Sequence, residues 1–149
     1  MIARRLLLTL PAILAARCSS PPPPPAVLTL AVIGGPDQNP DPAGQPAPVA
    51  VRLFQLKSTA AFDRADVFAL TEREQQTLGP DGQGSEEFVV RPGETRMITR
   101  ELKPGVQFIG TAVLFRNIDG ARWRGVAPVA ASGPSRHSLM IRGTTAALA

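Results

Sequence analysis

The stretch from Val49 to Leu70 changes its hydrophobic pattern along its length, and it organises the prediction for the whole fold. Over Val49–Leu53 the residues alternate between an apolar face and a second face, which is the period of a half-buried β-strand. Phe54 and Leu56 then place hydrophobic bulk on that second face. An apolar layer must cover it, so the sequence predicts a small helical insertion over about 58–78, directly after this strand.

The helical insertion carries its own start and stop signals. Ser58 is a predicted N-cap, because a serine side chain accepts a hydrogen bond from a free backbone N–H at the start of a helix. Thr71 and Glu74 fit a capping box that would begin a second short helix. Gly79 and Pro80 are expected to end that helix, since neither residue continues it.

Outside the insertion, short apolar runs separated by proline and glycine predict further strands. Val27–Ile33 is a first strand, and a β-meander is expected from Glu86 onwards, with Pro92-Gly93 and Pro104-Gly105 in type II turns. The later strands are expected at Glu86–Arg91, Glu94–Leu102, Val106–Arg116, around Trp123, and at His137–Arg142. In the strand around Trp123, the indole is expected to face inward and the side chains of Arg122 and Arg124 outward. Together these elements predict an all-β fold, an antiparallel β-sandwich with one helical insertion after its second strand.

The connection Gly34–Pro48 is long and contains five prolines. They exclude a helix or a central strand. A long connection in a compact domain is a binding loop, a disordered segment or a tolerated surface insertion. The prolines favour binding, because they restrict the free loop and so lower the cost of ordering it on a partner. The residues alone are compatible with binding and with a surface insertion.

The first residues are typical of an export signal. Two arginines precede the apolar run Leu6–Ala16, which is too short to cross a bilayer as a helix at about 1.5 Å per residue. Cys18, the only cysteine, follows, and Leu14–Cys18 resembles the lipobox of bacterial lipoproteins, with Arg17 where a small residue is usual. The alternative, cleavage by the ordinary signal peptidase, lacks a clean A-x-A site.

These features divide the chain into three parts. We predict a lipoprotein signal peptide at 1–17 and a segment 18–26 that contains the lipidated cysteine and a proline-rich tether. Five consecutive prolines favour a stiff polyproline II spacer. The sandwich domain with its insertion then occupies 27–149.

Charge argues against a nucleic-acid partner. The formal net charge is +4, but it includes Arg4, Arg5 and Arg17 of the predicted signal peptide. Without these three of the 16 basic residues, 13 basic residues face 12 acidic ones. An exported chain with so little net charge and few aromatic residues is not typical of proteins that bind nucleic acid.

The residue types also supply no catalytic set. His137 is the only histidine, so no histidine cluster for a metal ion and no obvious base for a nucleophile is present. Glu86 and Glu87 would point to opposite faces of a strand and could not act on one bond. We therefore expect no enzyme, no metal site, no small-molecule substrate and no cofactor other than covalent lipid on Cys18.

Four segments, in this order, resemble the outer-membrane lipoprotein of the type VI secretion system, the TssJ family. They are Pro-Val-Ala-Val-Arg-Leu-Phe-Gln-Leu-Lys-Ser at 48–58, Ala-Phe-Asp-Arg-Ala-Asp-Val-Phe-Ala-Leu at 61–70, Glu-Glu-Phe-Val-Val-Arg-Pro-Gly-Glu at 86–94 and Ala-Arg-Trp-Arg at 121–124. The resemblance runs from about Val27 to Ile141. It implies a transthyretin-like β-sandwich that acyl chains anchor to the periplasmic face of the outer membrane.

The resemblance also implies a protein partner, the periplasmic C-terminal domain of the large inner-membrane subunit, a TssM-like protein. The contact loop of the family lies between the first two strands, which corresponds to Gly34–Pro48 in this chain. The implied contact residues are Asp37, Gln38, Asn39, Pro40, Asp41, Pro42, Gly44 and Gln45.

The alternative is another envelope lipoprotein whose β-sandwich binds a ligand or a glycan. Such a protein should show an aromatic-lined cleft. This chain has six Phe, one Trp and no Tyr, and its pattern places most of them inward.

Overall fold

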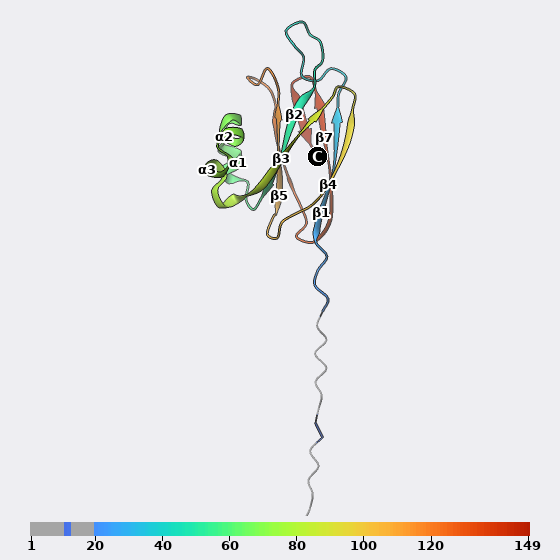
Figure 1. The fold of residues 1–149 in the computed structure, drawn as a ribbon, viewed down its shortest axis with the longest axis vertical. Coiled ribbons are helices and arrows are strands. Elements are labelled where there is room, and N and C mark those ends of the chain that lie inside the picture. Colours follow the sequence, from blue (N-terminus) through green and yellow to red (C-terminus); the bar gives the residue numbers. More distant parts are fainter. Residues whose placement is uncertain (1–10, 13–19) are drawn as a thin grey trace, which may run out of the picture.

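The structure is a computed structural model that describes residues 11–12 and 20–149. Within them, eight strands form two sheets, and three short helices lie beside one sheet (Figure 1). The strands are β1 (Ala26–Gly34), β2 (Val49–Leu56), β3 (Gly82–Val90), β4 (Thr95–Glu101), β5 (Phe108–Leu114), β6 (Arg124–Pro128), β7 (Gly133–Arg142) and β8 (Thr145–Leu148). The helices are α1 (Ala60–Arg64), α2 (Val67–Glu72) and α3 (Glu74–Leu78), and a 3₁₀ turn, η1 (Gly79–Asp81), follows them.

The predicted β-sandwich is confirmed, but its strand pairing differs from the prediction. Sheet A has the order β4-β1-β7-β8 and sheet B the order β3-β2-β5-β6. The pair β1 and β7 is parallel, so sheet A is mixed rather than antiparallel. The expected β-meander is wrong, because β3 and β4 belong to different sheets.

The turn between β3 and β4 explains that error. It forms as the sequence predicts: Gly93 has φ 75°, and the N–H of Glu94 donates a hydrogen bond of 3.0 Å to the carbonyl of Arg91, as in a β-turn. The turn nevertheless carries the chain from the edge of sheet B to the edge of sheet A. A turn signal and an alternating pattern therefore identify the strands and their buried faces, but not their partners.

Along β2 the apolar side chains change from one face of the strand to the other, as predicted, and this change organises the packing. Val49, Val51 and Leu53 lie in the core between the two sheets. The register of β2 against β3 shifts between Phe54 and Leu56, and these two side chains enter a second core under the helices. That second core consists of Phe54, Leu56, Phe62, Ala65, Leu70, Leu78 and Ala112. The helical insertion therefore exists because β2 is apolar on both faces at its end.

The helix starts differ from the predicted ones. The N-cap position of α1 is Thr59, whose side chain makes no cap bond, but the Oγ of Ser58 accepts a hydrogen bond of 3.4 Å from the N–H of Ala60, so the serine acts from one position earlier than predicted. Asp66 caps α2 instead, since its carboxylate accepts a hydrogen bond of 2.8 Å from the N–H of Ala69. Thr71 lies inside α2 and donates to the carbonyl of Val67, so it begins no capping box. Gly79, with φ 53°, ends α3 as expected.

Arg124 does not point freely outward, as its pattern predicted, but joins the helices to sheet B. Its guanidinium donates hydrogen bonds to the carbonyls of Phe62 and Ala65, at the end of α1. It also stacks over the Trp123 ring, 4.4 Å from the centroid. Burial lowers the pKa of the Arg124 guanidinium, while the carboxylates of Asp63 and Asp66 act in the opposite direction.

Replacing Arg124 with Met should loosen the helical insertion, because two carbonyls lose their donor and Trp123 loses the stacked cation. We expect the free energy of unfolding to fall by about 1–2 kcal/mol. Amide hydrogen exchange over 60–78 should accelerate more than in β1. Arg122→Met is the matched control, since the side chain of Arg122 is exposed, and it should behave like the wild type. Equal exchange in both variants would contradict this role of Arg124.

Candidate partner-binding loop

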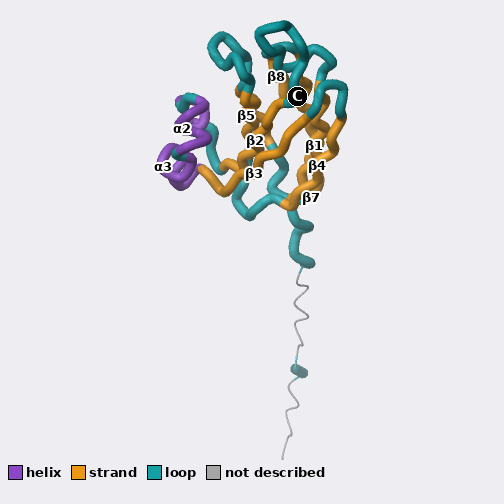
Figure 2. Tube along the Cα trace, turned by 45° about the horizontal axis from the view of Figure 1, so that its top comes forward, coloured by secondary structure: helices purple, strands orange, loops and turns teal. Residues whose placement is uncertain are grey.

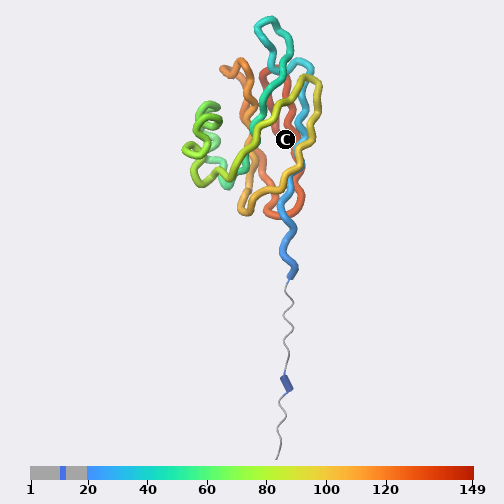
Figure 3. The backbone as a smooth tube through the Cα atoms, in the orientation of Figure 1, coloured from blue at the N-terminus to red at the C-terminus, as the bar shows by residue number. Residues whose placement is uncertain are grey.

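The loop between β1 and β2 stands at one end of the sandwich, and the N-terminal tether leaves from the other end (Figures 1 and 3). The separation follows from β1, which begins at the tether and ends at the loop. Its nine residues span roughly 26 Å at about 3.3 Å per residue. Whatever binds the loop is therefore held away from whatever binds the N-terminus.

The base of the loop is fixed by two buried polar side chains. Gln38 is 0% exposed, and its Nε2 donates to the carbonyls of Val90 at 2.8 Å and Ala47 at 3.2 Å. Asn39 is 6% exposed, and its Nδ2 donates to the carbonyl of Pro48 at 2.8 Å. The structure corrects the predicted contact set here, because these two side chains face the interior and cannot present a surface to a partner.

Asn39 also joins the loop to distant parts of the chain. Its Oδ1 accepts a hydrogen bond from the N–H of Arg116 at 2.8 Å, and its own N–H donates to the carbonyl of Gly143 at 2.8 Å. Its φ of 48° lies in the left-handed region, which asparagine tolerates better than most residues. One residue thus holds the loop against the end of β5 and the β7–β8 turn.

Two glycines allow the loop to leave β1 at close range. A Cβ on Gly35 would lie 2.4 Å from the carbonyl oxygen of Ile141, and a Cβ on Gly34 would lie 2.5 Å from that of Arg91. Any side chain would displace the backbone there. The Gly-Gly pair therefore serves close backbone packing.

Asp41 shapes the tip of the loop. Its Oδ1 accepts hydrogen bonds of 2.9 Å from the N–H groups of Ala43 and Gln45, while its backbone bonds to Gly44 and Gln45. Gly44, with φ 79°, supplies the left-handed residue of this turn. The tip is therefore an ordered turn rather than a flexible loop.

Of the eight predicted contact residues, four are exposed and four are not. The residues open to solvent are Asp37, Pro42, Gly44 and Gln45. Pro40 and Asp41 are half-buried, and Gln38 and Asn39 are buried. Ala43 and Pro46, which the prediction omitted, are also exposed, so the accessible tip is the continuous segment 42–46.

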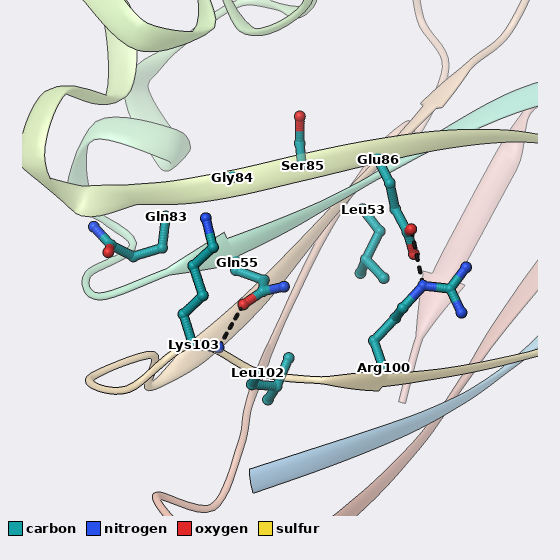
Figure 4. A pocket seen from close by; sticks show the side chains of 9 residues that line it. All are labelled: Leu53, Gln55, Gln83, Gly84, Ser85, Glu86, Arg100, Leu102 and Lys103. Atoms are coloured by element: carbon teal, nitrogen blue, oxygen red, sulfur yellow. Dashed lines mark hydrogen bonds and ion pairs between the residues drawn. The ribbon is translucent and has the colours of Figure 1, made fainter. Parts of the chain in front are cut away.

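A shallow pocket lies where the edges of the two sheets face each other, between β3 and β4 (Figure 4). Its volume is about 160 Å³, below the several hundred Å³ of most ligand sites. Arg100 Nε and Glu86 Oε2 form an ion pair of 2.9 Å across it, and Gln55 Oε1 accepts from the N–H of Lys103. None of its lining side chains is aromatic. The hollows lined by aromatic side chains lie beside α2 instead: one of about 280 Å³ includes Phe68 and Phe115, and one of about 390 Å³ includes Phe68 and Trp123.

The imidazole of His137 lies beside two backbone carbonyls of the sandwich. Its Nε2 lies 2.7 Å from the carbonyl oxygen of Pro128 and its Nδ1 3.3 Å from that of Ala149. In the part of the chain that the structure describes, no three His, Cys, Asp or Glu side chains are grouped to hold a metal ion. No helix within residues 11–12 and 20–149 is both long and apolar enough to span a bilayer.

The fold and the loop define a small two-sheet β-sandwich with a helical cover on one sheet and a braced loop at one end. Residues 26–144 match the family described as "Type VI secretion lipoprotein, VasD, EvfM, TssJ, VC_A0113". The chain belongs to this family of type VI secretion lipoproteins. No curated protein matches the sequence.

Solved structures support the same assignment. The T6SS lipoprotein TssJ1 from Pseudomonas aeruginosa is 37% identical over 85% of this chain and 96% of that chain, with a TM-score of 0.80. A chain in a structure described as a type VI membrane complex is 28% identical over 83% and 98%, with a TM-score of 0.74. A chain under the description "T6SS protein TssM C-terminal domain (869-1107) from EAEC" is 26% identical over 83% and 98%, with a TM-score of 0.71.

The predicted lipidation site lies outside the described residues, as do most residues of the predicted signal peptide. The tether after it is described from Ser20 onwards. Ser20 to Pro25 are exposed, and the carbonyl of Pro25 accepts a hydrogen bond of 3.1 Å from Gly133. The folded body therefore begins at Ala26, one residue before the predicted boundary.

Proposed function

We propose that this lipoprotein is an outer-membrane-anchored adaptor of the type VI secretion membrane complex. Acyl chains on Cys18, exposed by removal of 1–17, would hold it at the periplasmic face of the outer membrane. The tip 42–46 would bind the periplasmic C-terminal domain of the TssM-like inner-membrane subunit. The observation that carries this proposal is the placement of tether and loop at opposite ends of the body (Figure 3).

That placement suits a bridge between two membranes. The six tether residues 20–25 reach roughly 20 Å as polyproline II. The rigid body adds the length of β1, so the tip faces away from the anchored membrane. A contact at the tip transmits force along β1 to the tether without any turnover chemistry.

The construction of the tip suits binding as well. Its backbone groups are already bonded within the loop through Asp41, and its base is bonded through Gln38 and Asn39. Little conformational freedom is therefore lost when a partner binds, which favours affinity from a small surface. The descriptions of the two similar structures, a membrane complex and a TssM C-terminal domain, support the choice of partner.

The test exchanges the side chains of the tip and leaves its base intact. A variant with Pro42, Ala43, Gln45 and Pro46 replaced by serine keeps Asp41 and Gly44, so the turn should persist. We expect its affinity for the purified periplasmic domain to fall at least about tenfold, because a few tip residues would carry most of the binding energy. Thermal unfolding should change little, since these side chains are exposed.

A matched control replaces Gln83 and Gln107, which are exposed or half-exposed residues away from the tip, with serine. Its affinity should equal that of the wild type. Undiminished binding by the tip variant would place the interface elsewhere on the protein.

A further inference from the structure

Sheet B carries apolar side chains on its outer face at the end next to the loop between β1 and β2. Alternation along the strands identifies them, since their neighbours in β2, β3 and β5 face the core between the sheets. They are Val89 on β3, Ala50 on β2 and Leu114 on β5, and the register places Ala50 opposite both of the others. Neighbouring strands lie about 4.8 Å apart, so the three side chains form one row across the sheet.

The helix α2 extends this row. It buries Val67 and Leu70, whereas Phe68 faces solvent and is 59% exposed. The hollow of about 280 Å³ lies between Phe68 and the end of β5, and Leu114 and Ile118 also line it. Figure 2 shows α2 beside β5. We call the resulting surface the apolar strip, and it consists of Val89, Ala50, Leu114, Phe68 and Ile118.

The composition of the apolar strip is typical of an interaction surface. Among the described residues, the exposed large apolar side chains are Phe68, Val89 and Met97, and the first two belong to the strip. A single exposed apolar residue is ordinary, but a contiguous apolar surface beside a hollow marks a site of interaction. Glu72 and Arg116 line the same hollow and are exposed. The strip therefore combines an apolar centre with a charged rim, as protein interfaces do.

The apolar strip adjoins the base of the partner-binding loop. The strand β2 begins directly after this loop, and β5 ends at Leu114, two residues before Arg116. Asn39 joins these two places, because its Nδ2 donates to the carbonyl of Pro48 and its Oδ1 accepts from the N–H of Arg116. In Figure 1 the connection between β5 and β6 lies at the same end of the sandwich as the loop. A protein that binds the tip 42–46 therefore lies next to the strip.

The tip is too small to hold a partner by itself. A stable interface buries about 800 Å² per partner through about 20–30 residues, which is roughly 30–40 Å² per residue. At that value the tip 42–46 would bury only about 200 Å². We propose that the periplasmic domain that binds the tip also docks on the apolar strip and places an apolar side chain in the hollow beside Phe68. This inference rests on the proposed function, because it assigns a second surface to the same partner.

The surroundings of the strip favour this occupant. The other connections beside the loop are residues 91–94, between β3 and β4, and residues 143–144, between β7 and β8, and neither has an aromatic or branched apolar side chain. A membrane that holds the tether lies at the opposite end of the body and does not reach the strip (Figure 3). The volume of the hollow is just below that of most small-molecule sites, and it suits a single anchoring side chain.

The substitution Phe68→Ser tests the proposal in the full-length lipoprotein, purified in detergent, with the purified periplasmic domain as its ligand. We expect the affinity to fall at least about tenfold, because an aromatic residue at the centre of an interface carries much of the binding energy. Met97→Ser is the matched control, since Met97 is 61% exposed but lies on β4 of sheet A. Its affinity should equal that of the wild type. Thermal unfolding should change little in either variant, since both side chains are exposed.

Maleimide labelling tests the same contact without relying on a loss of affinity. Cys18 is the only cysteine, so Phe68→Cys and Met97→Cys each add one free thiol to the acylated lipoprotein. A saturating concentration of the periplasmic domain should slow the labelling of Phe68→Cys at least about tenfold, because the centre of an interface excludes water. The labelling of Met97→Cys should not change.

Three results would overturn the proposal: wild-type affinity of Phe68→Ser, unchanged labelling of Phe68→Cys by the saturating domain, or slow labelling without the domain that recovers on dilution. The last result would show a second copy of the lipoprotein on the strip. The tip variant separates this inference from the proposed function. If the tip variant loses affinity and Phe68→Ser does not, only the docking on the strip is wrong. If both variants bind like the wild type, the proposed contact at the tip is wrong as well.

Discussion

Replacing Asn39 with alanine is expected to lower the free energy of unfolding by about 2–4 kcal/mol. The substitution removes the bond to the Pro48 carbonyl and leaves the partly buried N–H of Arg116 without its acceptor. It also forces an alanine into φ 48°, which costs about 1–2 kcal/mol for a residue with a Cβ. Denaturant unfolding of the soluble domain measures the sum.

Asn39→Gly separates the two causes. Glycine adopts a positive φ without strain but makes neither side-chain bond. It should therefore destabilise the domain by about 1 kcal/mol less than alanine does. A glycine variant less stable than the alanine variant would contradict the role assigned to the backbone angle. An alanine variant as stable as the wild type would contradict the stabilising role of the Asn39 side chain altogether.

The same variants distinguish the base of the loop from its tip. Asn39→Ala should lose affinity for the periplasmic domain and stability together, because the tip is no longer held in place. The serine variant of the tip should lose affinity alone. This difference follows from burial, since Asn39 is 6% exposed and the segment 42–46 is exposed.

The sequence could predict the faces of the strands, but not which strands pair. Phe54 and Leu56 revealed the helical cover because a strand that is apolar on both faces requires two apolar layers. The parallel pairing of β1 with β7 joins segments about one hundred residues apart, and no local pattern encodes it. The strand β8, with its short run of Thr, Ala and Leu, was also missed.

The loop between β1 and β2 shows that the sequence could not predict which side chains of the candidate site are buried. Gln38 and Asn39 are polar residues in a proline-rich connection, so their composition suggested a solvent-facing contact. Their partners are backbone groups of Val90, Pro48 and Arg116, and two of these lie more than fifty residues away. A buried side chain whose partners are distant carbonyls and N–H groups leaves no periodic signal in the sequence.

Replacing Cys18 with serine should remove nearly all of the protein from the outer-membrane fraction. Serine lacks the thiol that receives the diacylglyceryl group, so no acyl chain would be attached. One acyl chain binds a membrane only marginally, whereas several together anchor a protein stably. The folded body begins at Ala26, beyond the proline tether, and its unfolding transition should therefore stay unchanged.

The residue before the cysteine provides a matched comparison. Arg17→Ala places a small residue where the lipobox normally has one, so the protein should remain in the membrane fraction and be processed at least as completely as the wild type. Mass spectrometry of the N-terminal peptide reports both the cleavage site and the acyl chains. If Cys18→Ser stayed in the outer-membrane fraction, the anchor would be something other than this cysteine. Another part of the protein would then have to attach to the outer membrane, since the tip 42–46 can join two membranes only when the opposite end of the sandwich is anchored.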